Sequence, residues 1–217
     1  VTSLVEQWLE QGHQIDVVTS LPWYEKHEVE NQWKGRLFRK EEKGLLTLTR
    51  LHPFPQDKNK LLRRLMGFLA FSFLASIASV SKKGPFDAVV VISPPLTLGT
   101  VGKAAAVRHR CKLLLNLQDI FPDIAVTLGK IKSRSSIKVL EKYEKLTYRG
   151  TDAITVLSKD LETNVNKKID RIKNPPQITV IPNFLISSSI KPQNRLTKYR
   201  EDHHLGEKFV VMYAGNL

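Results

Sequence analysis

The sequence has very little cysteine, and this scarcity excludes two kinds of site. Cys111 is the one cysteine in 217 residues, so no disulfide forms within the chain and no pair of thiolates holds zinc. The best interpretation of Cys111 is a small apolar residue inside the fold. A reducing compartment such as the cytoplasm fits this composition best.

The usual nucleotide and metal motifs are missing as well. Neither G-x-x-x-x-G-K-[ST] nor G-x-G-x-x-G occurs, and "GTVGK" at 99–103 has the wrong spacing. The six histidines form no H-E-x-x-H pattern, so a metal site has little support. The absence of these nucleotide motifs disfavours a kinase and an ordinary dinucleotide-binding protein.

No apolar run is long enough to cross a bilayer. The most apolar stretch, residues 65–81, has 17 residues without a charge, which is about 25 Å as a helix, whereas a span takes about 20 residues. Ser72, Ser76 and Ser79 make one stripe of this segment more polar than the rest. Two interpretations stay open: a helix packed on a sheet, or a helix whose outer face dips into a membrane interface.

Positive charge is present in excess. The formal net charge is +13, while only 8% of the residues are aromatic. This balance predicts a polyanionic partner, which is nucleic acid, a phosphorylated ligand or an anionic membrane surface. The basic residues are scattered instead of interleaved with aromatics, which disfavours nucleic acid.

The order of the predicted elements indicates a doubly wound α/β fold. Apolar runs predict strands at 14–20, 45–55, 86–95, 111–119, 151–158 and 177–183, and helical patterns occur at 98–110, 135–150 and 158–168. Residues 21–44 have no clear period and are predicted as a long loop. We therefore expect a Rossmann-like parallel sheet with helices on both faces.

Polar residues and prolines follow the ends of three predicted strands. They are Ser93, Pro94, Pro95, Gln118, Asp119, Pro122, Asp123 and Ser158. In open α/β sheets, ligands bind beyond the carboxyl ends of the strands, so these positions are candidate binding residues. The alternative is that Asp119, Asp123 and Ser158 cap the helices that follow.

The predicted helix 135–150 carries a stripe of cations at i, i+4, i+7 and i+11. These residues are Lys138, Lys142, Lys145 and Arg149. Such a stripe is either a solvated face or a surface that attracts anionic headgroups or a diphosphate.

Several of these segments together resemble the family 4 glycosyltransferases of the GT-B fold, in particular the bacterial polysaccharide-type members related to colanic acid and O-antigen glycosyltransferases. The resemblance covers almost the whole chain. It rests on "GHQIDVVTS", "DAVVVISPPL", "LLLNLQDIFPD", "TDAITVLSKDL", "ITVIPNFL" and "VVMYAGNL". It implies transfer from a nucleotide-sugar donor in a cleft between two Rossmann-like domains, with retention and without a metal or other cofactor.

The resemblance also implies a domain plan and roles for residues. Residues 1–190 are expected to be the acceptor-binding domain without its first strand, and 191–217 a linker and the first strand of the donor-binding domain. The fragment is expected to be inactive alone. Gln118 and Asp119 are the catalytic candidates, with Asp119 where many relatives carry a histidine. The other residues after the strands are candidates for acceptor binding, and Gly215 and Asn216 for donor binding.

The implied partners are a lipid-linked glycan acceptor and an anionic membrane, with the cation stripe facing membrane or phosphate at the inner face of the plasma membrane. No nucleic acid partner is expected. Two alternatives stay open: a non-catalytic basic α/β domain that binds nucleic acid or another polyanion, and a GT-B nucleotide-sugar epimerase.

Overall fold

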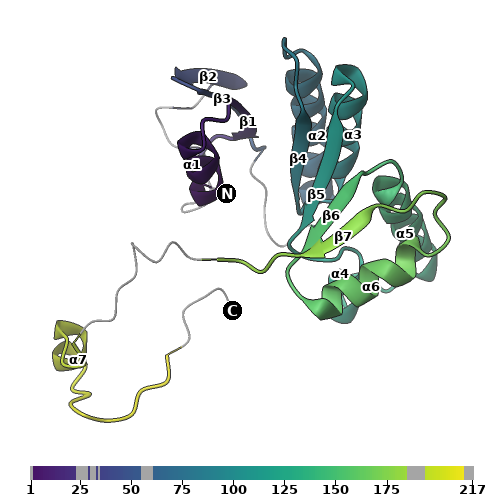
Figure 1. Cartoon of the computed structure of the whole chain (residues 1–217). Helices are drawn as coiled ribbons and strands as arrows, with labels where there is room; N and C mark the ends of the chain where they lie inside the picture. Colours follow the sequence, from purple (N-terminus) through teal and green to yellow (C-terminus); the bar gives the residue numbers. More distant parts are fainter. Residues whose placement is uncertain are drawn as a thin grey trace. The chain divides into compact units, whose positions relative to one another are not determined.

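The structure is a computed structural model, and it describes residues 2–22, 29, 33, 35–54, 61–184 and 194–212 (Figure 1). The chain divides into two compact units, Val1–Pro182 and Asn183–Leu217. Both sheets belong to the first unit, and the short helix α7 (Lys198–Asp202) belongs to the second.

From α2 onward the first unit places helices between successive strands, as the sequence predicts. Its elements are α1 (Thr2–Glu10), β1 (Ile15–Ser20), β2 (Phe38–Lys43), β3 (Leu46–Leu51), α2 (Leu61–Val80), β4 (Ala88–Ser93), α3 (Thr97–His109), β5 (Lys112–Leu117), α4 (Asp123–Thr127), α5 (Arg134–Tyr148), β6 (Ala153–Val156), α6 (Lys159–Ile169) and β7 (Gln177–Val180). The predicted α/β class, with a Rossmann-like parallel sheet and flanking helices, is confirmed.

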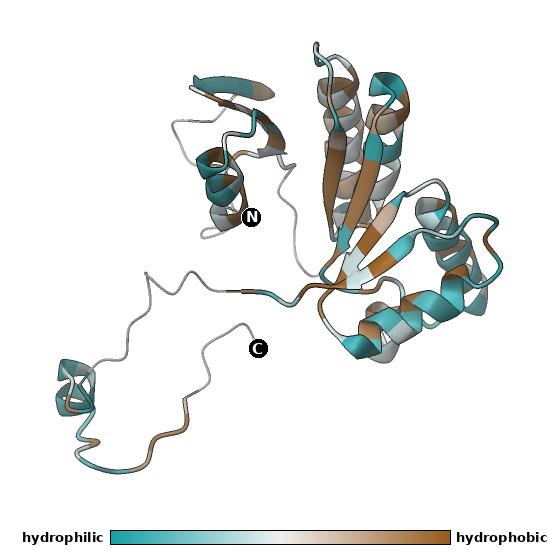
Figure 2. Ribbon diagram, in the orientation of Figure 1, coloured by the Kyte–Doolittle hydropathy of each residue, from teal (hydrophilic) through white to brown (hydrophobic). Residues whose placement is uncertain are grey.

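Strands β4, β5, β6 and β7 form a fully parallel sheet in that order. Leu115 pairs in register with Val91 and with Ile154, so the three side chains point to one face. Helices α3, α5 and α6 pack on this face, where they complete the main hydrophobic core. Figure 2 shows β4 and β5 as brown, apolar strands, and such continuous apolar runs are typical of parallel sheets.

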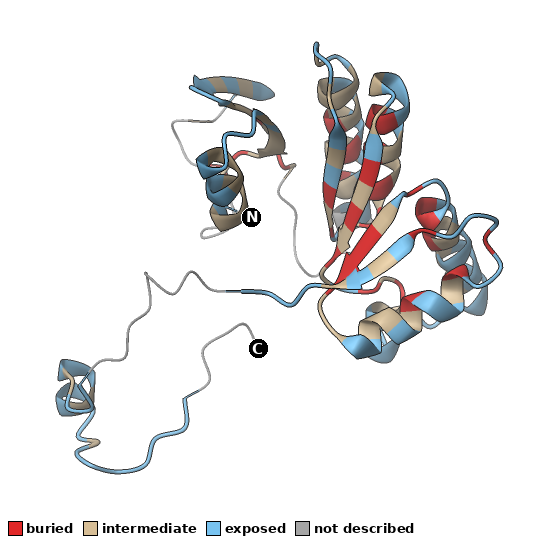
Figure 3. Cartoon of the chain, viewed as in Figure 1, coloured by how far each residue is buried: buried red, intermediate tan, exposed pale blue. Residues whose placement is uncertain are grey.

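The opposite face of the same sheet is less covered. Val90, Leu114, Ala153 and Gln177 pair in register across this face, and Val90 keeps 39% of its surface exposed. Gln177 is exposed, while Leu114 and Ala153 are half-buried. In Figure 3 more exposed positions alternate with less exposed ones along β4, as expected for a strand covered on one side.

The first three strands form a separate sheet, in the order β1-β3-β2. The structure corrects the expectation that all strands join one parallel sheet: β1 is parallel to β3, but β2 is antiparallel to it. The predicted loop at 21–44 is wrong for residues 38–43, which form β2. Its sequence, "FRKEEK", is too charged to stand out as a strand, because β2 is an edge strand whose side chains are mostly exposed.

Helix α2 packs against both the three-stranded sheet and α3. Ala75 is buried in a second core cluster with Leu51 of β3 and Val101 of α3. After the helix ends, the Lys82 ammonium group donates to Asp16 at 2.7 Å and to Thr49 at 2.9 Å. In the described part of the chain, no helix combines the length and apolar character needed to cross a membrane.

Two glycines let α3 approach its neighbours closely. A Cβ atom on Gly99 would lie 2.1 Å from the Thr147 Cγ2 atom, and one on Gly102 would lie 2.2 Å from the Val91 Cγ2 atom. Neither distance is compatible with van der Waals contact, so any larger residue requires the helix or the contacted side chain to move.

The predicted strand at the end of the chain is not seen in its described part. Residues 208–212 belong to no sheet, because a strand requires a neighbouring strand to pair with. The prediction that they open a second domain stays a prediction. Helices α4 and α7 were not predicted, because five residues are too few to show a helical period.

Candidate active site

The three predicted strand ends meet at one edge of the parallel sheet. Ser93 pairs in register with Leu117 of β5, and Leu117 pairs with Val156 of β6. The residues that follow these strands are therefore neighbours in space, although they are far apart in the sequence. This edge holds the carboxyl ends of the strands, where ligands bind in α/β proteins.

A chain of polar side chains runs along this edge. The Gln118 amide donates to the Asn116 side-chain oxygen at 2.5 Å, and the Asn116 amide donates to the Thr155 hydroxyl at 2.8 Å. The sequence analysis selected Gln118 but missed Asn116 and Thr155. The available signal was Asn116 itself, which interrupts the apolar run of "LLLNL".

Asp119 lies exposed between two anchored neighbours. The backbone N–H of Gln118 donates to the carbonyl oxygen of Ser93 at 3.0 Å, and Ile120 is buried, with 5% of its surface exposed. The Asp119 carboxylate has no hydrogen-bond or ion-pair partner among the described residues. Within the described residues, the Asp119 carboxylate is therefore available to accept a hydrogen bond from a ligand, and its two neighbours hold its backbone in place.

The other residues at the strand ends differ in exposure. Ser93 is buried, with 3% of its surface exposed, while Pro94 is exposed and Pro95 half-buried. Ser158 is the N-cap of α6, and its hydroxyl accepts a hydrogen bond from the Leu161 N–H at 3.3 Å. The capping interpretation of Ser158 is therefore confirmed, and a role in acceptor binding stays a prediction.

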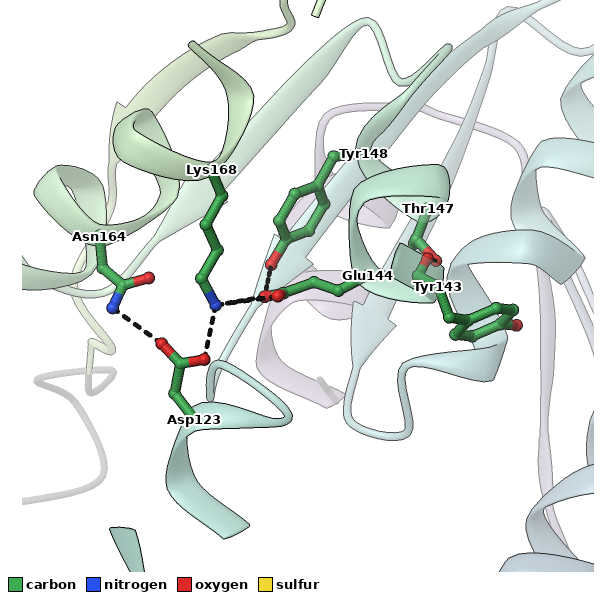
Figure 4. A network of polar contacts seen from close by, with 7 residues as sticks. All are labelled: Asp123, Tyr143, Glu144, Thr147, Tyr148, Asn164 and Lys168. Carbon is green, nitrogen blue, oxygen red and sulfur yellow. Dashed lines mark hydrogen bonds and ion pairs between the residues drawn. The ribbon is translucent and has the colours of Figure 1, made fainter. Parts of the chain in front are cut away.

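Asp123 faces a polar network instead of the open edge (Figure 4). One carboxylate oxygen accepts from the Lys168 ammonium group at 2.7 Å, and the other accepts from the Asn164 amide at 2.9 Å. Asp123 lies in the first turn of α4, while Pro122 is the N-cap. Asp123 therefore ties the segment that carries Asp119 to α6, and it does not serve as the cap.

Lys168 also binds a buried carboxylate, Glu144 of α5. The ammonium group lies 2.8 and 2.9 Å from the two oxygens, and the Tyr148 hydroxyl donates to the same carboxylate at 2.8 Å. Only 1% of the Glu144 surface is exposed. Burial raises the pKa of Glu144, against the opposing effect of Lys168, and burial next to this carboxylate also raises the pKa of Tyr148.

Three members of the predicted cation stripe lie on α5, and the fourth, Arg149, follows the helix as its C-cap with an extended backbone. Lys138, Lys142 and Arg149 are exposed and Lys145 is half-buried. None of the four forms an ion pair within the described residues. Their positive charge is thus available to an external anion.

Potential metal ligands do not gather anywhere in the described residues: no three His, Cys, Asp or Glu side chains are placed to hold an ion. Cys111 is a free thiol that packs at the margin of the main core, and burial raises its pKa. The donor-binding candidates Gly215 and Asn216 lie outside the described residues.

A parallel sheet with polar side chains at its carboxyl edge is the arrangement in which open α/β domains bind ligands. Residues 1–183 match the glycosyl transferase 4-like domain, and the chain belongs to this family. It is also similar to the putative colanic acid biosynthesis glycosyl transferase WcaI of Escherichia coli strain K12. The two are 23% identical over 226 residues, a stretch that covers 100% of this chain and 54% of that protein. The chain thus spans about half the length of this curated relative.

Proposed function

We propose that the full-length protein transfers a sugar from a nucleotide-sugar donor to a lipid-linked glycan acceptor in the synthesis of a cell-surface polysaccharide. The proposal includes retention of anomeric configuration, no metal cofactor and action at the inner face of the plasma membrane. Membership of the glycosyl transferase 4-like family supports sugar transfer from such a donor. The similarity to a colanic acid glycosyl transferase supports a polysaccharide product.

The observation that carries the proposal is the position of Asp119. Its carboxylate is exposed, has no partner among the described residues, and lies two residues after the end of the inner strand β5. A carboxylate fixed in this way can accept a hydrogen bond from a sugar hydroxyl and orient it for attack on the anomeric carbon. It can also take up the proton that the hydroxyl releases as the new bond to the anomeric carbon forms and the bond from that carbon to the nucleotide diphosphate breaks, so the diphosphate leaves with the electron pair.

The polar chain beside Asp119 supports sugar binding. The amide of Gln118 is held by Asn116, which is held in turn by Thr155. Each of these groups has further hydrogen-bonding capacity, which suits a ligand with many hydroxyl groups. The unpaired cations of α5 support an acceptor that carries a diphosphate, because ammonium and guanidinium groups bind phosphate well.

The test is transfer by the full-length protein with a panel of nucleotide sugars and a lipid-linked acceptor. Asp119→Asn should lower the turnover number at least about tenfold, since it removes a general base and keeps the shape. Asp87→Asn is the matched control, because Asp87 is an exposed carboxylate at the amino end of β4. Unchanged turnover in Asp119→Asn would remove Asp119 from the site, and a free epimer without transfer would contradict the proposed reaction.

A further inference from the structure

Helix α2 is apolar on all sides but is covered on one side only. Its sequence has no charged residue between Arg64 and Lys82. A helix that is hydrophobic all round is normally buried on all sides, in a core or in a membrane. The outer side of α2 is exposed within the described residues. The question is therefore which partner covers this apolar surface.

The inner side of α2 carries most of its small and polar residues. Ala75 and Ala78 pack in the cluster around Leu51 and Val101. Ser72 is 7% exposed, and its hydroxyl donates to the Thr97 hydroxyl of α3 at 2.8 Å. The Ser79 hydroxyl donates to the carbonyl oxygen of Ala75 at 2.6 Å. Ser72 of the predicted serine stripe therefore meets protein instead of water, and Ser76 and Ser79 are half-buried.

The outer side carries large apolar side chains. We call it the α2 stripe, and its members and exposed fractions are Leu65 (45%), Met66 (61%), Leu69 (47%), Phe73 (67%) and Ile77 (50%). Four of them are spaced four residues apart, so they form one line along the helix, about 18 Å long. A continuous apolar surface of this kind marks a site of interaction.

The charged residues near the α2 stripe indicate which kind of partner binds it. Arg63 lies exposed at one end of the stripe and Lys83 beyond the other. Helix α3 contacts both α2 and α5, so α5, with its exposed Lys138 and Lys142, is separated from α2 by one helix. An apolar stripe bordered by cations complements an interface that has acyl chains beneath anionic headgroups.

We infer that the α2 stripe inserts into the interface of an anionic phospholipid membrane, with α2 lying along the surface. The helix does not meet the requirements for crossing a bilayer, which is consistent with this orientation. The inference deepens the proposed function, because a membrane-bound enzyme meets a lipid-linked acceptor where that acceptor resides. Membrane binding is measured in an assay that does not involve sugar transfer. A negative result for membrane insertion therefore leaves the proposed sugar transfer untouched, and the reverse also holds.

The first experiment is sedimentation of the full-length protein with vesicles of phosphatidylcholine, with and without phosphatidylglycerol. The wild-type protein should bind the anionic vesicles, and added salt should weaken binding. The variant Leu69→Asp/Phe73→Asp should bind at least about tenfold more weakly, because it places two charges in the apolar interface. Both side chains are largely exposed, so the fold should persist, which circular dichroism checks.

The matched control is Leu128→Asp. Leu128 is 65% exposed, close to the value of Phe73, and it follows α4 instead of lying on the α2 stripe. This variant should bind vesicles as the wild type does. Equal binding by the stripe variant and the wild type would overturn the inference. So would equal loss in the control and the stripe variant.

A second experiment does not depend on weakened binding. In the variant Phe73→Trp, the emission of the added indole should shift to the blue when anionic vesicles are added, whereas in Leu128→Trp it should not shift. Bound protein without a shift at position 73 would contradict insertion. Self-association of the wild-type protein in solution that Leu69→Asp/Phe73→Asp abolishes, with vesicle binding unchanged, would assign the stripe to a second copy and overturn the inference.

Discussion

The ammonium group of Lys168 contacts both oxygens of the buried Glu144 carboxylate, at 2.8 and 2.9 Å. The same group lies 2.7 Å from Asp123, so one side chain of α6 connects α5 with the segment after β5 (Figure 4). Because Asp119 belongs to that segment, the network fixes the backbone from which the candidate catalytic carboxylate projects.

Lys168→Met should destabilise the protein by about 3 kcal/mol, because it leaves a buried carboxylate without its cation. The measurement is urea denaturation of both proteins at neutral pH. The double variant Lys168→Met/Glu144→Gln should recover part of the loss, since it leaves no buried charge.

The neighbouring Lys167→Met is the control for the loss of a lysine as such. Lys167 is exposed and forms no ion pair within the described residues, so its removal should change stability by about 0.5 kcal/mol or less. If Lys168→Met were no more harmful than this control, the network would not contribute to stability.

Gly102→Ala should destabilise the protein by about 1 to 3 kcal/mol through overpacking. The new Cβ atom would lie 2.2 Å from Val91 Cγ2 and 3.1 Å from Leu113 Cδ1. Alanine is a better helix former than glycine by about 1 kcal/mol, so helix propensity alone would make this substitution stabilising. A net loss of stability must therefore come from the steric clash.

A double variant tests the cause of that loss. Val91→Ala removes the methyl group that the new atom would meet, so Gly102→Ala should cost less stability in the Val91→Ala background than in the wild type. Thermal denaturation of the four proteins gives the coupling. Equal effects in the two backgrounds would show that Val91 does not limit this position.

Asp152 should make the free energy of unfolding depend on pH in acidic solution. The Lys112 ammonium group at 2.7 Å and the Leu113 N–H at 2.9 Å hold the pKa of Asp152 below its ordinary value of 3.8. The folded state therefore favours the ionised form, and this stabilisation is present above pH 3.8 and disappears as the pH falls through the lowered pKa.

Asp152→Asn keeps an oxygen that can accept from Leu113 but removes the titration. The wild type should exceed this variant in free energy of unfolding at neutral pH, and the difference should shrink as the pH is lowered below 3.8. Denaturant titrations at a series of pH values measure it. If the difference in free energy of unfolding between the wild type and Asp152→Asn grew as the pH fell, the prediction would be wrong.

The sequence predicted the parts of the fold that depend on local pattern. The apolar runs of β4 and β5 mark strands at any position in a chain, and Ser158 signals a helix start directly. Strand β2 was missed because its charged side chains are mostly exposed, so burial leaves no apolar pattern in its sequence. The hairpin signal was Gly44, which has a positive φ of 57° between β2 and β3.

The candidate site was predictable only in part, because its contacts depend on sheet register and on distant residues. Gln118 and Asp119 stood out as polar residues after an apolar strand. Asn116 meets Thr155 across the sheet, 39 residues along the chain, and Asp123 meets Lys168 45 residues away. No local pattern identifies such partners, which is why the role of Asp123 in the network was missed.

Strands β1 and β4 each pair on one side only among the described strands. Each therefore presents a row of unmatched N–H and C=O groups, and β4 offers them along the apolar sequence "AVVVIS". Such rows are templates onto which an extended segment of another molecule can add. A concentrated solution of these 217 residues alone is thus expected to form oligomers or precipitate, and storage at low concentration should keep it clear.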